Sequence, residues 1–166
     1  MSKVVIFGIG RGADVATRYF RADSPHEIVA YTVDDAYAAR KEFMGRPVIP
    51  FSRVETEVPP AECRMFIPLG FQRMNALRAE KYAAAKEKGY SLESYVSSKI
   101  VAWERPAFGE NCFILEGNVF DFDVTHVLPK NAPDIHSAVF EHAATLKILR
   151  LLLIGRDRRL LISGPA

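Results

Sequence analysis

The stretch that decides the fold of this chain is Lys3-Val4-Val5-Ile6-Phe7-Gly8-Ile9-Gly10-Arg11-Gly12-Ala13. The run from Lys3 to Phe7 is mostly β-branched and aromatic with no polar alternation, which is typical of a strand buried on both faces of a parallel sheet. A glycine turn follows, and from Ala13 to Phe20 the apolar residues recur at helical spacing. The order strand, glycine turn and helix predicts the opening of an α/β unit.

A second strand follows at the spacing that a nucleotide-binding unit requires. The run from Glu27 to Val33 predicts a strand that closes on Asp34 and Asp35. The pattern G-x-G-x-x-A, followed about 20 residues later by an acid at the end of the next strand, fits the dinucleotide-binding fingerprint. We expect Asp34, or less favourably Asp35, to accept hydrogen bonds from a ribose or a base.

Each residue of the glycine turn has an expected task. Gly8 allows the tight turn, Gly10 lets the backbone approach a phosphate, and the small Ala13 lets the helix pack closely on the sheet. The helix N-terminus presents N–H groups to an anion, and Arg11 adds a cation. The alternative is that the glycines only shape a turn and Arg11 is solvated. The predicted nucleotide-binding residues are Gly8, Gly10, Arg11, Gly12, Asp34, Asp35 and Gly70.

Strands and helices alternate up to residue 96, which predicts an α/β fold with a small doubly wound parallel sheet. Gly70 would end a third strand at the ligand edge of that sheet. The further expected elements are a helix at 36–43, a turn at 44–47, an extended segment at 48–50, a loop at 55–62, a strand at 64–70, a helix at 74–88 and a strand at 92–96.

The composition narrows the function classes. The chain has 166 residues, 49% of them hydrophobic, and its formal net charge of +2 argues against nucleic acid or a membrane surface as the main partner. Cys63 and Cys112 are isolated, which predicts no metal site and a reducing, cytoplasmic location. The first apolar run is too short for a signal peptide, and no apolar run predicts a transmembrane segment.

A different periodicity of apolar residues begins in the second half of the chain. Phe108, Ile114 and Phe120 recur every six residues, and Cys112 and Asn118 each lie four places after an apolar partner. A six-residue interval is the spacing of a hexapeptide-repeat β-helix, in which every sixth side chain points into the prism. From periodicity alone, a β-hairpin with an aromatic core is nearly as good an interpretation.

The order of several segments resembles a known family. The segments are 4–10 (VVIFGIG), 29–34 (VAYTVD), 45–50 (GRPVIP), 65–70 (MFIPLG), 94–99 (SYVSSK) and 109–114 (GENCFI). Together they look like the bacterial sugar O- or N-acetyltransferases of the sialic acid and bacillosamine type, over about residues 2–125. The resemblance implies a Rossmann-like N-terminal domain, a left-handed β-helix and assembly as a homo-oligomeric trimer.

The resemblance also implies an activity. Members of this family transfer an acetyl group from acetyl-CoA to a hydroxyl or amine of a sugar that is often nucleotide-linked. By resemblance, the turn at Gly8-Ile9-Gly10, together with Asp34 and Gly70, would hold the nucleotide portion of a nucleotide sugar. The resemblance divides the chain into a nucleotide-sugar-binding domain (1–98), incipient β-helix coils (99–125) and a divergent tail (126–166).

The chain departs from the family pattern where the next hexad should begin, at His126. Family members use a histidine of the β-helix as general base, a task that suits imidazole because its pKa lies near neutrality. The segment that ends at His142 is the nearest local context, so His142 is the candidate catalytic residue. His126, His136 and His26 are weaker candidates.

The tail leaves several interpretations open. Residues 137–154 have helical spacing and a basic, apolar character, which suits a membrane surface, a partner, or a cover for the end of a truncated prism. A shifted reading frame past Thr125 would also explain the change of pattern. The function hypotheses are an acetyltransferase-like protein, truncated and inactive in one version, and a non-catalytic nucleotide-binding or assembly module. An NAD-dependent oxidoreductase or sensor is disfavoured because the sequence offers no recognisable hydride-transfer site.

Overall fold

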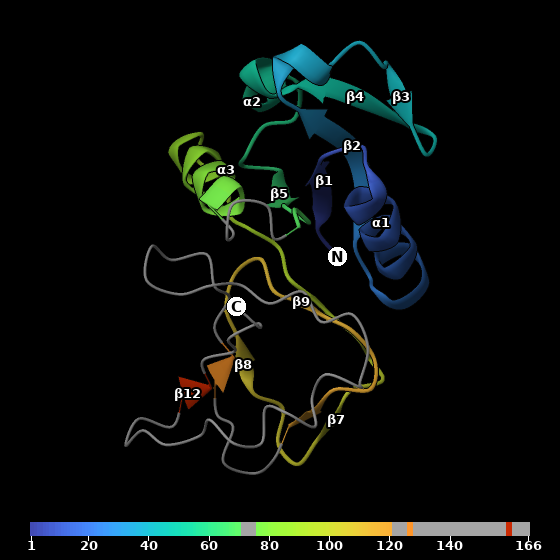
Figure 1. Cartoon of the computed structure of the whole chain (residues 1–166), viewed down its shortest axis with the longest axis vertical. Helices are drawn as coiled ribbons and strands as arrows, with labels where there is room; N and C mark the ends of the chain where they lie inside the picture. The colour runs from blue at the N-terminus through green and yellow to red at the C-terminus, as the bar shows by residue number, and fades with distance from the viewer. Residues whose placement is uncertain (71–75, 121–125, 128–158, 161–166) are drawn as a thin grey trace. The chain divides into compact units, whose positions relative to one another are not determined.

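The structure is a computed structural model that describes residues 1–70, 76–120, 126–127 and 159–160 (Figure 1). The chain divides into two units, Met1–Glu93 and Ser94–Ala166. Over the described residues, no helix has the length and apolar character needed to cross a membrane. The predicted catalytic residue His142, the histidine at 136 and the predicted helix at 137–154 lie outside the described residues.

The first unit is built on a five-stranded sheet in the order β3-β4-β2-β1-β5 (Figure 1). β1 pairs in parallel with β2 on one side and with β5 on the other, and β2 pairs in parallel with β4. The short β3 is antiparallel to β4. The prediction of an α/β fold with a parallel sheet is therefore confirmed. The strands are β1 Lys3–Phe7, β2 Glu27–Val33, β3 Glu42–Phe43, β4 Arg46–Pro50 and β5 Cys63–Phe66.

One of the helices expected from the sequence does not form. The expected helix at 36–43 is wrong: a short 3-10 turn is followed by β3, which returns into β4 through Met44 and Gly45. Both residues have positive φ, 48° and 78°, which is the geometry of a two-residue hairpin turn. The helices are α1 Arg11–Asp23, η1 Asp35–Tyr37, η2 Phe51–Arg53, α2 Val54–Glu57 and α3 Ala76–Glu87.

Three further predicted segments have other boundaries in the structure. The loop expected at 55–62 begins inside α2, and the strand expected at 64–70 ends at Phe66. Gly70 therefore lies four residues beyond the end of β5 and is not the last residue of that strand. Of the strand expected at 92–96, only Leu92 bridges to the sheet, opposite Met65, whereas Tyr95 and Val96 pair within the second unit.

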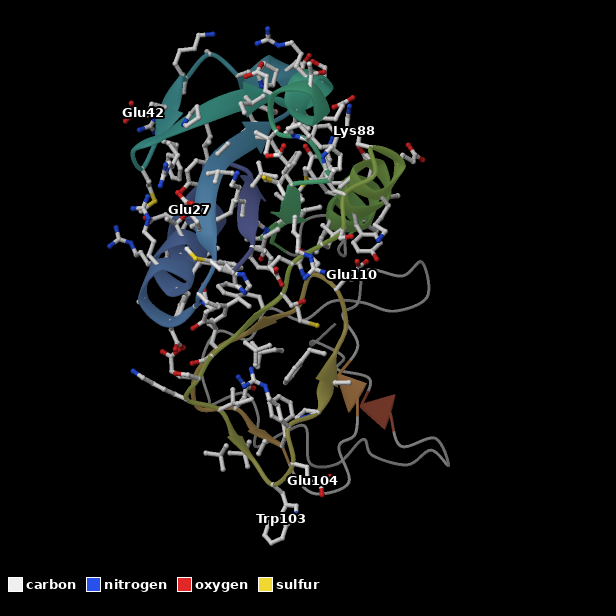
Figure 2. All side chains as sticks on the ribbon, turned by 180° about the vertical axis from the view of Figure 1, so that it is seen from behind. Glu27, Glu42, Lys88, Trp103, Glu104 and Glu110 are labelled. Atoms are coloured by element: carbon white, nitrogen blue, oxygen red, sulfur yellow. The ribbon has the colours of Figure 1, made fainter. Side chains whose placement is uncertain are left out.

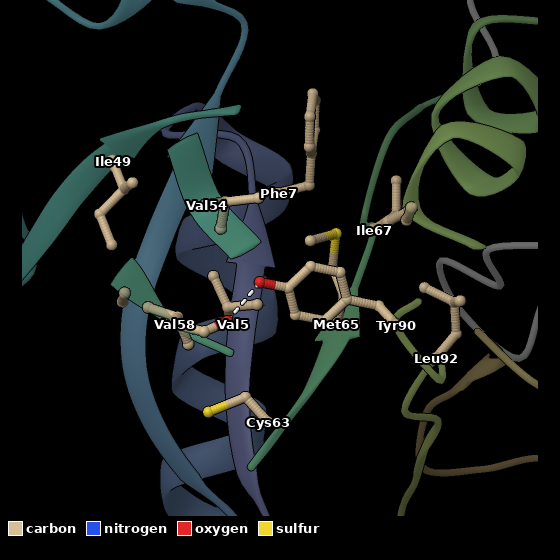
Figure 3. Packing of buried hydrophobic residues seen from close by; sticks show 12 residues of the cluster. Val5, Phe7, Ile49, Val54, Val58, Cys63, Met65, Ile67, Tyr90 and Leu92 are labelled. Atoms are coloured by element: carbon tan, nitrogen blue, oxygen red, sulfur yellow. Dashed lines mark hydrogen bonds between the residues drawn. The ribbon is translucent and has the colours of Figure 1, made fainter. Parts of the chain in front are cut away.

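Buried side chains cover both faces of the sheet. On one face α1 packs through Ala16 and Phe20, and the Phe20 ring meets Phe66 edge-on at 5.0 Å. On the other face the Tyr90 hydroxyl donates a hydrogen bond to the Val58 carbonyl (Figure 3). Burial of this apolar surface is the main stabilising term of the unit. The cluster on that second face comprises Val5, Phe7, Ala30, Ile49, Val54, Val58, Cys63, Met65, Ile67, Ala85, Tyr90 and Leu92.

The second unit consists of two-residue strands. The first five begin six residues apart, at positions 95, 101, 107, 113 and 119. Tyr95 pairs in parallel with Phe113, and Val101 with Val119, each 18 positions later. The hairpin interpretation is therefore wrong, because these pairs are parallel. The strands are β6 Tyr95–Val96, β7 Val101–Ala102, β8 Ala107–Phe108, β9 Phe113–Ile114, β10 Val119–Phe120, β11 His126–Val127 and β12 Arg159–Leu160.

The register changes at β11. Ala107 pairs in parallel with His126, 19 positions later, so one extra residue separates this pair from the spacing of the first two. β11 also pairs in parallel with β12. The change coincides with the point at which the sequence pattern departs, and these two strands are the only part of the predicted tail that the structure describes.

Candidate functional site

The carboxyl edge of the first sheet contains a reversal of strand order. From β1 the chain passes through α1 to β2 and then to β4 on one side of β1, whereas β5 pairs on the opposite side. In open α/β sheets, ligands bind outside the carboxyl ends of the strands at such a switch point. Here the switch lies between β1, which ends at Phe7, and β5, which ends at Phe66.

The glycine turn after β1 is held against β2 and against the segment that follows β5. Gly8 has a φ of +106°, a conformation that side chains disfavour, and its amide donates to the Thr32 carbonyl at 2.7 Å. A Cβ at Gly12 would lie 2.3 Å from the Pro68 carbonyl oxygen. The close approach that we expected at Ala13 is therefore made at Gly12, although Ala13 is itself buried.

The outer part of the turn is open. A Cβ at Gly10 or at Gly70 would meet no described atom within 4 Å. Gly10 is the N-cap of α1 and provides no side-chain cap, so the first amides of the helix remain available to an anion. Arg11 begins the helix and is exposed. A 13-residue helix that starts at an open glycine turn is suited to receive a phosphate group.

Asp34, directly after β2, is held by a lysine that the sequence reasoning missed. The Lys81 Nζ of α3 donates to Asp34 Oδ1 at 2.7 Å and lies 5.7 Å from the centroid of the Phe7 ring. Burial lowers the pKa of Lys81, but its hydrogen bonds and charge interactions with Asp34 and Glu80 outweigh burial and raise that pKa above its ordinary value. Lys81 is therefore charged at neutral pH.

Lys81 lies on the buried face of α3. Lys81 lies three residues after Arg78 and four before Ala85, and both of these residues are buried. Residues three and four apart share one face of a helix. The sequence predicted a helix at 74–88 but did not assign its buried face, so Lys81 was not recognised as a site residue.

Asp35 has a different role from Asp34. Its Oδ1 accepts the Ser52 amide at 3.2 Å, and the hydrogen bonds from Ser52 lower the pKa of this exposed carboxyl. Asp35 therefore ties η1 to η2. Of the two acids, Asp34 is the one that contacts Lys81 beside the end of β1.

An aromatic pair completes this edge. The rings of Phe7 and Phe51 meet edge-on at 5.4 Å, and Lys88 Nζ lies 5.2 Å from the centroid of the Phe51 ring. Lys88 also donates to both carboxylate oxygens of Glu55, at 2.6 and 2.7 Å. Figure 2 labels Lys88 beside α3. Two ion-paired lysines thus flank one aromatic pair.

Of the two described histidines, the one in the first unit lies at the opposite edge of the sheet. His26 precedes β2, at the amino edge of the sheet, and its Nδ1 lies 2.6 Å from the Ser2 hydroxyl, which donates to Glu93 at 2.8 Å. His126 is in β11. Among the described residues there is no group of three or more metal-ligating side chains.

Comparison with protein-family models and with curated proteins gives no match. Solved structures do match. One is a histidine-to-asparagine variant of perosamine N-acetyltransferase from Caulobacter crescentus with CoA and GDP-perosamine, at 22% identity and a TM-score of 0.57. Another is PerB from the same organism with the same two ligands, at 19% identity and a TM-score of 0.56. A third is the acetyltransferase domain of PglB from Neisseria gonorrhoeae with acetyl coenzyme A, at 16% identity and a TM-score of 0.53.

The matches cover most of this chain and part of the others. The coverage is 78% of this chain and 57% of the perosamine N-acetyltransferase variant, 78% and 73% for PerB, and 76% and 60% for the PglB domain. At these identities the likeness concerns the fold. The chain thus has the mixed α/β fold, with a parallel sheet and helices, of sugar acetyltransferases.

Proposed function

We propose that this chain is a sugar acetyltransferase-like protein that binds a nucleotide-linked sugar and uses acetyl-CoA as co-substrate. One observation carries the proposal: a glycine-turn α/β unit is followed by two-residue strands that pair in parallel 18 positions apart. The same fold occurs in the perosamine N-acetyltransferase that was crystallised with CoA and GDP-perosamine. The activity belongs to the proposal, because this chain spans 57% of that one.

The first unit is the proposed site for the nucleotide portion. Phosphates would lie at the open turn around Gly10, where the amides of α1 and Arg11 carry positive charge. The bond to Lys81 uses Asp34 Oδ1, so Oδ2 has no partner among the described residues and would accept a sugar or base donor. Gly12 would keep α1 close to the segment after β5.

The second unit is proposed to be the start of a β-helix. Eighteen residues per coil correspond to three hexads, so each face would repeat once per coil. Ile114 and Phe120, six positions apart, are buried, as inward-facing positions of such a prism require. Its left-handedness, a homo-oligomeric trimer and a cytoplasmic location belong to the same proposal.

The reaction would be an acyl transfer. The sugar amine or hydroxyl attacks the thioester carbonyl, a C–N or C–O bond forms, the C–S bond breaks, and CoA leaves as the thiol. A general base takes the proton of the attacking group. His142 is the proposed base, and a protein that lacked it or the later coils would bind the nucleotide sugar without turnover.

A second candidate function is an assembly module without catalysis. Val101, Trp103 and Val119 are 61%, 80% and 67% exposed, and Val101 and Val119 are direct register partners. Figure 2 shows Trp103 pointing away from the ribbon. Exposed apolar residues gathered on one strand pair favour an interaction surface.

Ligand binding separates these functions. Thermal-shift titrations with GDP- and UDP-linked amino sugars, acetyl-CoA and NAD should show stabilisation by a nucleotide sugar and by acetyl-CoA, and an assay of CoA release should detect turnover. Stabilisation by NAD alone would refute the acetyltransferase proposal. Stabilisation by none of them, with oligomers in analytical ultracentrifugation, would favour the assembly module. If turnover occurs, His142→Ala should abolish it, and unchanged turnover would exclude His142 as the base.

A further inference from the structure

We propose that Lys81 is a specificity-determining residue of the nucleotide site: it offsets the charge of Asp34, so that a nucleoside diphosphate can bind next to an acid. This inference rests on the proposed function. It concerns a residue that neither the sequence pattern nor the likeness to solved structures assigns.

The position of Lys81 supports this role. Its ammonium group contacts Asp34, at the end of β2, and lies over the ring of Phe7, the residue before the glycine turn. The Lys81 side chain is 13% exposed, whereas that of Asp34 is 38% exposed. The lysine is therefore the inner member of the pair, and the carboxylate is the member that a ligand can reach.

The charges explain why a cation is needed there. The diphosphate of a nucleotide carries at least two negative charges, and the proposed phosphate position is the turn that directly follows Phe7. An uncompensated carboxylate in a partly buried site would repel that group. With Lys81 at 2.7 Å the pair has no net charge, and Asp34 can still accept a hydrogen bond through Oδ2.

Docking of α3 on the sheet is the competing explanation. Lys88, seven residues after Lys81, has an equivalent contact with Glu55. Ion pairs of this kind therefore do attach α3 and its C-terminal end to the rest of the first unit. A purely structural lysine would affect all ligands of the site to the same degree. A charge-offsetting lysine affects charged ligands more than neutral ones, and its loss is corrected by removing the acid.

The test compares affinities for the diphosphates GDP and UDP with those for guanosine and uridine, by isothermal titration calorimetry on the full chain. In Lys81→Met the affinity for the diphosphate should fall about tenfold more than that for the nucleoside, the order expected for one charge in a partly buried site. The double variant Asp34→Asn/Lys81→Met should regain diphosphate affinity relative to Lys81→Met. Lys86→Met, which removes an exposed lysine of the same helix, should change neither affinity.

Each outcome decides the inference. An equal loss for diphosphate and nucleoside in Lys81→Met, or a double variant no better than the single one, would overturn it while leaving the proposed function intact. A wild-type chain that binds neither GDP nor UDP would overturn both. If Lys81→Met does not fold, Asp34→Asn alone decides: the site then has a net positive charge, and the ratio of diphosphate to nucleoside affinity should rise above that of the wild type.

Discussion

Two neighbouring glycines of the turn have separable roles, which a pair of alanine variants can test. In Gly12→Ala the new Cβ would lie 2.3 Å from the Pro68 carbonyl oxygen, below the 3.0 Å that real Cβ contacts respect. The contact is with backbone, so it cannot be relieved by rotating a side chain. In Gly10→Ala the new Cβ meets no described atom within 4 Å, and the φ of −97° is ordinary for alanine.

The magnitudes follow from these two environments. Within a helix, alanine is more favourable than glycine by about 1 kcal/mol, so Gly12→Ala would stabilise the protein if the methyl group fitted. Overpacking of this kind costs about 1–3 kcal/mol, and we expect a net loss of about 2 kcal/mol. For Gly10→Ala, the weaker N-cap and the smaller entropy of the unfolded chain roughly cancel, which leaves a change below about 1 kcal/mol.

Urea denaturation followed by circular dichroism at 222 nm measures both effects. With a slope of about 2 kcal/mol per molar urea, Gly12→Ala should lower the midpoint by about 1 M, and Gly10→Ala should leave it nearly unchanged. Gly10→Ala should instead weaken GDP and UDP binding, because its methyl group occupies the space proposed for a phosphate. A Gly12→Ala variant as stable as the wild type would refute the packing argument, and unaltered nucleotide binding in Gly10→Ala would refute the phosphate position.

Three further predictions concern groups buried in the two units. Burial raises the pKa of Tyr31, and the hydrogen bond between its hydroxyl and that of Thr17 offsets part of this rise. Stability should therefore fall as pH rises above about 10, where the unfolded chain loses the tyrosine proton first. Tyr31→Phe should show a smaller fall in the urea midpoint between about pH 9 and about pH 11, a range centred on the ordinary tyrosine pKa. Burial also raises the pKa of the Cys63 and Cys112 thiols, that of Cys112 to about 12. Both should therefore react with a thiol reagent at pH 8 only after unfolding, and rapid reaction of the native chain would contradict their burial. The Ser94 hydroxyl accepts a hydrogen bond from the Cys112 amide at 2.9 Å and donates one to the Gly109 carbonyl at 2.6 Å. Ser94→Ala should therefore destabilise the second unit by about 1–2 kcal/mol. The fluorescence of the single tryptophan during urea unfolding measures this loss.

In the first unit, the elements that the sequence predicted correctly are those in which burial dictates the residue type. β1 and β2 were predicted with the bounds that the structure has, because strands covered on both faces need apolar runs that end sharply. The region 36–43 was predicted wrongly because its alanines favour a helix locally, whereas the positive φ of Met44 and Gly45 turns the chain into a hairpin. The pairing of β3 with β4 outweighs the local preference.

The six-residue interval was recognised only where its apolar side chains are large. Phe108, Ile114 and Phe120 revealed it, whereas the structure continues the same interval back to Val96 and Ala102. Alanine and valine are common in every kind of element, so they carry little periodic signal. Periodicity alone did not show that these strands pair in parallel.

The sequence by itself determined the order of the elements, the glycine turn and the acid at the end of β2, because local steric rules and burial select these residues wherever they occur. Only the tertiary structure decided which of the turn glycines is closely packed and which acid contacts Lys81. Those two facts depend on segments that are distant in the chain: Pro68 approaches Gly12 across the switch point, and α3 brings Lys81 to Asp34 across 47 positions. Contacts of that range leave no periodic trace in the sequence, since they are set by how helices and strands pack.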